Sequence, residues 1–193
     1  MIGAVLAGGR GRRFGGDKLL FRVNGAPLIQ HALERLSLAE GIDEVVVVAS
    51  PENARALEEL GYRVVVDRML LGPISGVYTA LGLGDAFIVA GDMPLIVPEF
   101  VDYIIARFER SGRRICVPRW ENGYLEPLHA VYPAEFQSVL EQRIEDGDYA
   151  LNRAIRSTDA CYLGLESVPE EWILSLFNVN RKEDLKKLSN TFL

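Results

Sequence analysis

Short runs of β-branched and aliphatic residues alternate along this chain with segments of helical period, and this alternation limits the folds open to it. The runs are IGAVL at 2–6, EVVVVA at 44–49, RVVV at 63–66 and AFIVA at 86–90. Strands that alternate with helices form βαβ units, and runs that are apolar on both faces belong in the middle of a covered sheet. The sequence therefore predicts an α/β fold: a doubly wound, mostly parallel sheet with helices on both faces.

Apolar residues at helical spacing predict helices between these strands, at 27–38, 51–60, 75–83 and 98–110. The later part is less regular, with strands predicted at 114–117 and 128–132 and helices at 133–143, 149–156 and 181–188. Because no linker separates the two halves, we expect a single domain over residues 1–193.

The composition argues against several classes of binding partner and metal site. The 193 residues carry a net charge of −6, which argues against binding to nucleic acid or to an anionic membrane. The two cysteines, Cys116 and Cys161, form no CxxC pair, so we expect neither a zinc knot nor a disulfide framework. The start of the chain lacks a basic leader and no apolar run reaches transmembrane length. We therefore expect a cytoplasmic protein with no membrane partner.

One basic segment departs from the acidic composition. Residues 6–18 read LAGGRGRRFGGDK, directly after the first predicted strand. Glycines let backbone N–H groups approach an anion closely, and arginine and lysine side chains add hydrogen bonds to phosphate oxygens. The segment predicts a polyphosphate-binding loop, although it matches neither a Walker A loop nor a dinucleotide fingerprint. The alternative is a solvated glycine-rich turn.

Two further loops follow predicted strands, and ligands of open α/β sheets bind at the carboxyl ends of the strands. Asp67 and the sequence GPISG at 72–76 follow the third strand, where a helix start offers N–H groups to an anion or a base edge. An ordinary helix start is the alternative.

GDMP at 91–94 follows the fourth strand. A carboxylate at the end of a buried strand needs a partner, and Mg²⁺ beside a polyphosphate would suit Asp92. The alternative is that Asp92 caps the helix at 98–110.

These segments, taken with EPLHAVY at 126–132 and FNVNRKEDL at 177–185, resemble the molybdenum cofactor guanylyltransferase family in the right order over nearly the whole chain. The resemblance implies a Rossmann-like nucleotidyltransferase fold. It also implies a reaction in which the terminal phosphate of molybdenum-molybdopterin attacks the α-phosphorus of GTP, giving molybdopterin guanine dinucleotide and pyrophosphate. The implied partners are GTP, the molybdopterin cofactor, and proteins that deliver the cofactor and receive it.

The resemblance also assigns roles to residues. Those implied to contact GTP are Leu6, Ala7, Gly8, Gly9, Lys18, Asp67, Gly72, Pro73, Gly76 and Asp92. Asp92 would bind Mg²⁺, while Lys18 and Arg13 would stabilise the departing pyrophosphate, so these three are the implied catalytic residues. A phosphate nucleophile is already ionised at neutral pH, so the reaction needs no general base.

The choice of base and acceptor stays open at the level of sequence. In the family, Gly8 stands where cytidylyl-transferring relatives carry alanine, which points to guanine. The alternatives are a transferase of the same fold that uses CTP or another acceptor, such as a sugar phosphate or a cobalamin precursor, and a non-catalytic nucleotide-binding regulator. The presence of Lys18 and Asp92 argues against the regulator.

Four residues are candidates for the acceptor side: Glu126, His129, Asn178 and Asn180. A histidine on a strand is more often packed than catalytic, and Asn180 with Glu183 has the spacing of a capping box. The turn at 120–123 is a candidate flap over the pterin.

Overall fold

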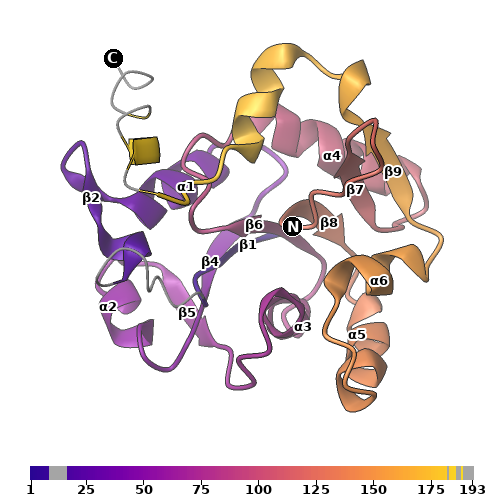
Figure 1. The fold of residues 1–193 in the computed structure, drawn as a ribbon, viewed down its shortest axis with the longest axis horizontal. Helices are drawn as coiled ribbons and strands as arrows, with labels where there is room; N and C mark the ends of the chain where they lie inside the picture. Colours follow the sequence, from indigo (N-terminus) through magenta and orange to yellow (C-terminus); the bar gives the residue numbers. More distant parts are fainter. Residues whose placement is uncertain (9–16, 182, 186–187, 189–193) are drawn as a thin grey trace.

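The computed structural model describes residues 1–8, 17–181, 183–185 and 188. The strands of its main sheet are β1 (Ile2–Leu6), β4 (Glu44–Ala49), β5 (Arg63–Val66), β6 (Ala86–Ala90), β7 (Cys116–Arg119), β8 (His129–Tyr132) and β9 (Cys161–Gly164). They lie in the order β5-β4-β1-β6-β8-β7-β9 (Figure 1). Only β8 runs against its neighbours, β6 and β7. The predicted mostly parallel sheet is confirmed.

Helices cover both faces of this sheet. They are α1 (Leu28–Leu36), α2 (Ala54–Glu58), α3 (Pro73–Leu81), α4 (Pro98–Arg110), α5 (Phe136–Glu145) and α6 (Leu151–Arg156). Figure 1 shows α1 and α4 on one side of the sheet and α3, α5 and α6 on the other. Successive side chains of a strand point to opposite faces. In β6, Phe87 and Val89 accordingly pack with α1 and α4, while Ala86 and Ile88 pack with α3 and α5. The doubly wound arrangement is confirmed.

The most regular segments were predicted with the right bounds. The strands at 2–6, 44–49, 63–66 and 86–90 and the helix at 98–110 match the structure residue for residue. The other predictions are shifted or too long: α2 spans only Ala54–Glu58, and β7 begins two residues later than predicted. Of the helix predicted at 181–188, residues 183–185 and 188 are described as helical. β9 was not predicted.

A small hairpin that was not predicted follows the first loop. The short 3-10 helix η2 (Lys18–Leu20) leads into β2 (Arg22–Val23) and β3 (Ala26–Pro27), which pair antiparallel. Asn24 and Gly25 form the turn with φ of 48° and 88°. Asn-Gly is the strongest two-residue hairpin signal because both residues tolerate a positive φ.

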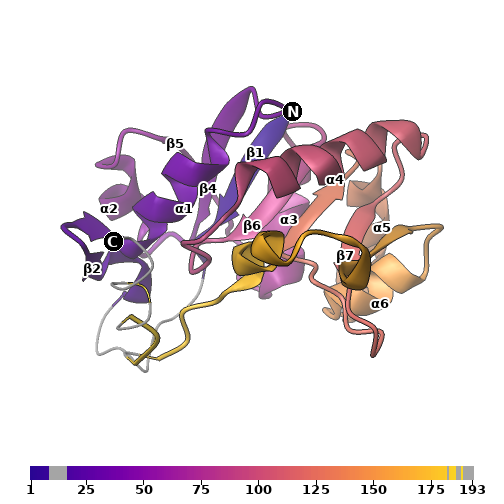
Figure 2. The ribbon, with the colours of Figure 1, turned by 90° about the horizontal axis from the view of Figure 1, so that it is seen from above.

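The end of the chain returns to the first half of the sheet. After β9, the 3-10 helices η3 (Leu165–Ser167) and η4 (Glu170–Leu176) lead into a segment that runs back toward β2 (Figure 2). Val179 there joins a small core with Val23 and Leu95, and its N–H donates to the Asp92 carbonyl at 2.9 Å. The loop after β6 is thus fixed by residues near the end of the chain. In the described part of the chain, every helix is too short or too polar to cross a membrane.

Candidate functional site

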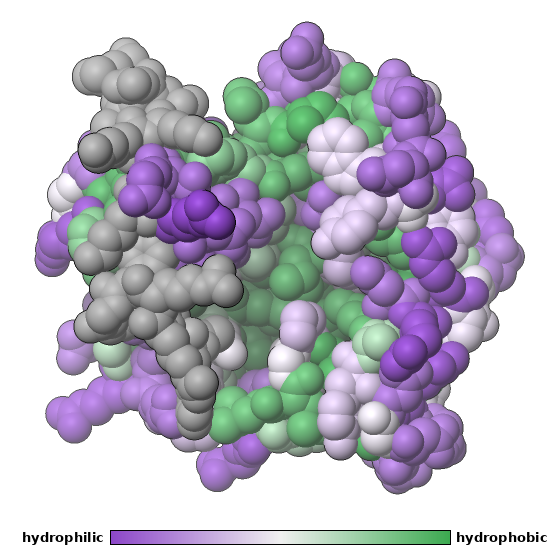
Figure 3. All heavy atoms as spheres, in the orientation of Figure 1, coloured by the Kyte–Doolittle hydropathy of each residue, from purple (hydrophilic) through white to green (hydrophobic). Residues whose placement is uncertain are grey.

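A cavity of about 340 Å³ opens at the carboxyl ends of β1 and β6. It lies where the strand order reverses, because the chain passes from β1 outward to β5 and then returns to β6 on the other side of β1. Figure 3 shows a hollow near the centre of this face that is lined largely by hydrophobic residues. Ligand pockets in proteins have this character, with a few polar groups that fix the ligand.

Most of the residues implied to contact a nucleotide line this cavity: Leu6, Gly8, Lys18, Asp67, Gly72, Pro73, Gly76 and Asp92. Ala7 is fully buried below it. Gly9 and Arg13 lie outside the described residues. The lining also includes residues that the sequence did not single out: Leu19, Val48, Ala90, Gly91 and Leu128. Leu128 reaches the cavity because β8 runs antiparallel to β6, so the start of β8 lies beside the end of β6.

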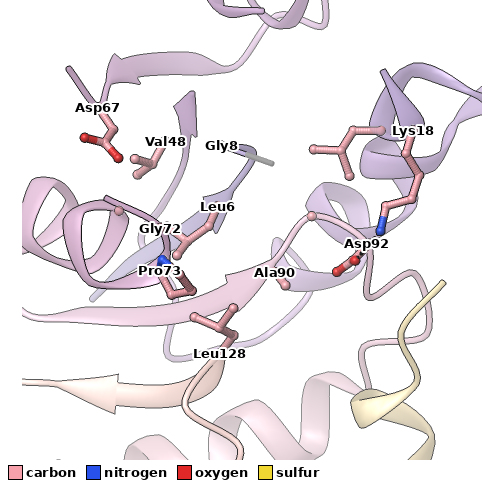
Figure 4. A pocket seen from close by; sticks show the side chains of 13 residues that line it. Leu6, Gly8, Lys18, Val48, Asp67, Gly72, Pro73, Ala90, Asp92 and Leu128 are labelled. Carbon is pink, nitrogen blue, oxygen red and sulfur yellow. Dashed lines mark hydrogen bonds and ion pairs between the residues drawn. The ribbon is translucent and has the colours of Figure 1, made fainter. Parts of the chain in front are cut away.

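Lys18 and Asp92 meet at one end of the cavity (Figure 4). Lys18 Nζ lies 2.5 Å from Asp92 Oδ2 and also donates to the Val179 carbonyl at 2.8 Å. Their side chains are 17% and 19% exposed, respectively, so each charge is partly desolvated and depends on the other. The alternative that Asp92 caps α4 is not observed, because Val97 occupies the cap position of α4 and no side chain caps it.

Asp92 is the residue of this cavity best placed to hold a metal ion. Its Oδ1 atom has no hydrogen-bond partner among the described residues. No group of three or more histidine, cysteine, aspartate or glutamate side chains in the described chain could enclose a metal. A single carboxylate fits Mg²⁺, which completes its shell with water and phosphate oxygens, better than it fits a cation that needs an all-protein cage.

Asp67 stands at the opposite end of the cavity, across Leu6 and Val48 (Figure 4). It is only 4% exposed, and both of its carboxylate oxygens are engaged. Oδ1 accepts from the Met69 N–H at 2.9 Å, and Oδ2 accepts from the Ser75 hydroxyl at 2.6 Å. The carboxylate therefore fixes the loop before α3 and shapes the wall of the cavity.

Asn53 holds the two ends of the predicted phosphate loop. Its Nδ2 donates to the Ala7 carbonyl at 2.8 Å and to Asp17 Oδ2 at 3.1 Å. Asp17 Oδ1 in turn accepts from the Leu19 N–H at 3.0 Å, at the start of η2. Sequence reasoning did not find Asn53, because nothing in its neighbourhood marks it; its role depends on the end of β4 lying beside the end of β1.

Two of the four candidates for the acceptor side line a cavity and two do not. Glu126 and Asn178 line a second cavity, of about 380 Å³, which shares Pro73 and Leu128 with the first. Asn180 is exposed and lies in neither cavity. Its backbone N–H donates to Asp184 Oδ2 at 2.9 Å, so the helix start is closed by Asp184 rather than by Glu183.

The structure places His129 away from both cavities, contrary to its assignment to the acceptor side. The side chain is fully buried, stacked on Phe100 with ring centroids 5.1 Å apart and edge-on to Phe87 at 5.2 Å. Neither ring nitrogen has a hydrogen-bond partner in the described structure. Burial lowers the pKa of His129 to about 3. The alternative of a packed strand histidine is the one observed.

Comparisons with known proteins agree with this geometry. The family model of the MobA-like NTP transferase domain matches residues 3–161. A protein of Thermococcus gammatolerans named probable molybdenum cofactor guanylyltransferase is 68% identical over 188 residues, which cover 97% of this chain and 98% of that protein. A Pyrococcus furiosus protein of the same name is 53% identical over 193 residues, covering 100% and 98%.

A solved structure shares the whole fold. The crystal structure of molybdopterin-guanine dinucleotide biosynthesis protein A from Archaeoglobus fulgidus superimposes with a TM-score of 0.87 at 29% identity, covering 100% of this chain and 98% of that one. The resemblance seen in the motifs thus extends over the full length. This chain therefore belongs to the MobA-like NTP transferases, in the family of the molybdenum cofactor guanylyltransferases.

Proposed function

We propose that this protein transfers GMP from GTP to the terminal phosphate of molybdenum-molybdopterin, giving molybdopterin guanine dinucleotide and pyrophosphate. The observation that carries the proposal is the Lys18–Asp92 pair at the end of a glycine-lined cavity, at the switch point of the sheet. The names of the full-length relatives support the choice of GMP and molybdopterin over CTP or another acceptor.

In this proposal the base of GTP lies at the Asp67 end of the cavity and the phosphates lie at the Lys18 end. Leu6 and Val48, which lie between the two ends of the cavity, supply an apolar surface for the purine. Gly76 lets α3 approach the end of β1, because a Cβ there would lie 3.1 Å from the Leu6 side chain. A Cβ at Gly8 would meet nothing within 4 Å, so the glycine leaves open space in the lining for the larger base.

The chemistry proposed for the site is alignment and charge stabilisation. When the triphosphate enters, Lys18 exchanges part of its contact with Asp92 for phosphate oxygens, and Asp92 becomes available to a cation. Mg²⁺ held there would supply positive charge at the α-phosphate. We assign Arg13 to the departing pyrophosphate, as the family motif implies. The acceptor phosphate is its own nucleophile, which agrees with a described cavity lining that contains no histidine.

The test is to incubate the protein with Mg²⁺, molybdopterin and each nucleoside triphosphate in turn, and to measure pyrophosphate release. We expect release with GTP alone and loss of release when EDTA removes the metal. Release with CTP alone would reject the guanylyl assignment. GTP binding with no release in any mixture would favour the regulator.

The cytoplasm is the proposed location, and it agrees with two cysteines that are free thiols, Cys116 and Cys161. Proteins that deliver molybdopterin and receive the product are proposed as partners because the reaction needs a source and a recipient.

A further inference from the structure

The second cavity holds a carboxylate whose position is fixed from two sides. Glu126 Oε1 accepts from Trp120 Nε1 at 2.6 Å. The Glu126 N–H donates to the Pro118 carbonyl at 3.0 Å, and the Trp120 N–H donates to the Tyr124 carbonyl at 2.9 Å. Oε2 has no hydrogen-bond partner in the part of the chain that the structure describes. One edge of a pre-positioned carboxylate is therefore open.

This carboxylate is partly desolvated. Burial raises the pKa of Glu126 above its usual range, against the opposing hydrogen bond from Trp120. Among the described residues, no cation pairs with Glu126. Such a carboxylate gains most from ligand groups that donate two hydrogen bonds in one plane, since each of its oxygens can accept more than one.

We propose that Glu126 recognises the pterin ring of the acceptor by accepting hydrogen bonds from the ring N3–H and the adjacent 2-amino group. The inference rests on the proposed function, which makes a molybdopterin the acceptor. A pterin is by definition a 2-amino-4-oxo ring system, so these two donors lie side by side on one edge. Their spacing matches the two oxygens of a carboxylate, as the two N–H groups of an arginine do in a bidentate arginine–carboxylate pair.

The rest of the cavity suits a flat, polar ring. Tyr124, 59% exposed, and Leu128 offer aromatic and apolar surface to the ring. Asn152 also lines the cavity, and its Oδ1 is buried without a hydrogen-bond partner in the described structure. That oxygen is sealed from the cavity, so ring recognition is assigned to Glu126 alone.

The cavity is also placed correctly for the reaction. Pro73 and Leu128 line both cavities and lie together below the space that leads toward Asp92 (Figure 4). Met93, which follows Asp92 in the chain, lines the second cavity. A ring held at Glu126 would therefore extend its phosphate-bearing side toward the Lys18–Asp92 end of the first cavity.

The test compares two ring compounds that differ only at position 2. Binding of 6-hydroxymethylpterin and of 6-hydroxymethyllumazine, which has oxygen in place of the 2-amino group, is measured by calorimetry without GTP. Wild-type protein should prefer the pterin by about tenfold or more, since the lumazine presents an acceptor to the carboxylate. Glu126→Gln should lose the preference.

Two controls separate recognition from folding. Glu109→Gln changes an exposed carboxylate on α4 that lines neither cavity, and it should keep the preference. GTP affinity should be unchanged in both variants. A purely structural Glu126 would alter stability but not the ratio of the two ring affinities. Equal binding of the two rings by wild-type protein, or a preference that survives in Glu126→Gln, would overturn the proposal.

These outcomes are distinct from those of the transfer assay. A protein that releases pyrophosphate from GTP but does not distinguish the two rings refutes the role of Glu126 and leaves the proposed function standing. A protein that distinguishes the rings but transfers no GMP refutes the proposed function instead.

Discussion

Lys18 and Asp92 are 74 residues apart in the chain and form one ion pair in the fold. The sequence predicted both as site residues because each follows a strand, but it gave no reason to expect a direct bond between them. The pair explains how a partly buried carboxylate and a partly buried ammonium are both stable before a ligand arrives. The pair also means that a phosphate can bind Lys18 only by competing with the Asp92 carboxylate for the ammonium group.

Asp92→Ala should abolish GMP transfer, with a loss of about 10³-fold or more, because the variant removes the carboxylate proposed to hold Mg²⁺. The free energy of unfolding should fall by about 1–3 kcal/mol, since Lys18 loses its charged partner but keeps its bond to the Val179 carbonyl. Pyrophosphate release and urea denaturation check the two parts. Asp159→Ala, which removes a surface partner of Arg114, is the control and should keep full activity. Transfer at the wild-type rate in Asp92→Ala would remove the metal role.

At the scale of elements, the loop between β5 and α3 shows how local chemistry builds one wall of the cavity. Gly72 precedes α3 with φ of 82° and Leu70 has φ of 55°, so the turn holds two residues in the left-handed region. Only glycine adopts that region at no steric cost. Ser75 stabilises the turn by donating to Asp67 at 2.6 Å and accepting from the Leu71 N–H at 2.9 Å.

Ser75→Ala should therefore lower the free energy of unfolding by about 1–3 kcal/mol, because it leaves one oxygen of the buried Asp67 carboxylate and the Leu71 N–H without their partner. Urea denaturation measures the loss. Ser138→Ala is the matched control: the Ser138 hydroxyl donates to the Glu135 carbonyl on an exposed part of the surface, and its loss should cost much less. We also expect a raised KM for GTP in Ser75→Ala alone. Equal stability of the two variants would show that the buried network contributes little.

At the scale of the whole molecule, the site depends on segments from both ends of the chain. Val179 closes the arrangement with two backbone bonds, one to the Asp92 carbonyl and one from Lys18. The core between the sheet and α4 has a purely structural role at His129, which fills space between Phe87 and Phe100 and lines neither cavity.

Burial of neutral His129 makes stability depend on pH. Its pKa falls from 6.5 to about 3 in the folded protein. Below pH 6.5 the His129 imidazole therefore becomes protonated in the unfolded chain while it stays neutral in the folded protein. This contribution is fully present above pH 6.5 and is lost as the pH falls toward 3, by at most about 1.4 kcal/mol per pH unit. His129→Leu should flatten the stability curve between about pH 6 and pH 4. Urea midpoints across this range test it; an unchanged slope in His129→Leu would refute the claim.

The sequence by itself determined the parts of this protein that depend on local pattern. Continuous apolar runs predicted the central strands β4, β1 and β6, because a run that is apolar on both faces is stable only inside a covered sheet. The loops after β1 and β6 could be assigned to the site because carboxyl ends of neighbouring strands meet at one edge. Asn24-Gly25 carried a hairpin signal that sequence reasoning overlooked.

Only the tertiary structure decided which side chains meet. Val48, Asn53 and Val179 reach the site through contacts between distant segments, and no short-range pattern in the sequence encodes such contacts. His129 and Glu126 stand three residues apart, yet one is sealed in the core and the other lines a cavity. The reason is the pairing of β8: His129 lies opposite Val89 in the sheet, whereas Glu126 precedes the strand in a turn whose direction depends on β7.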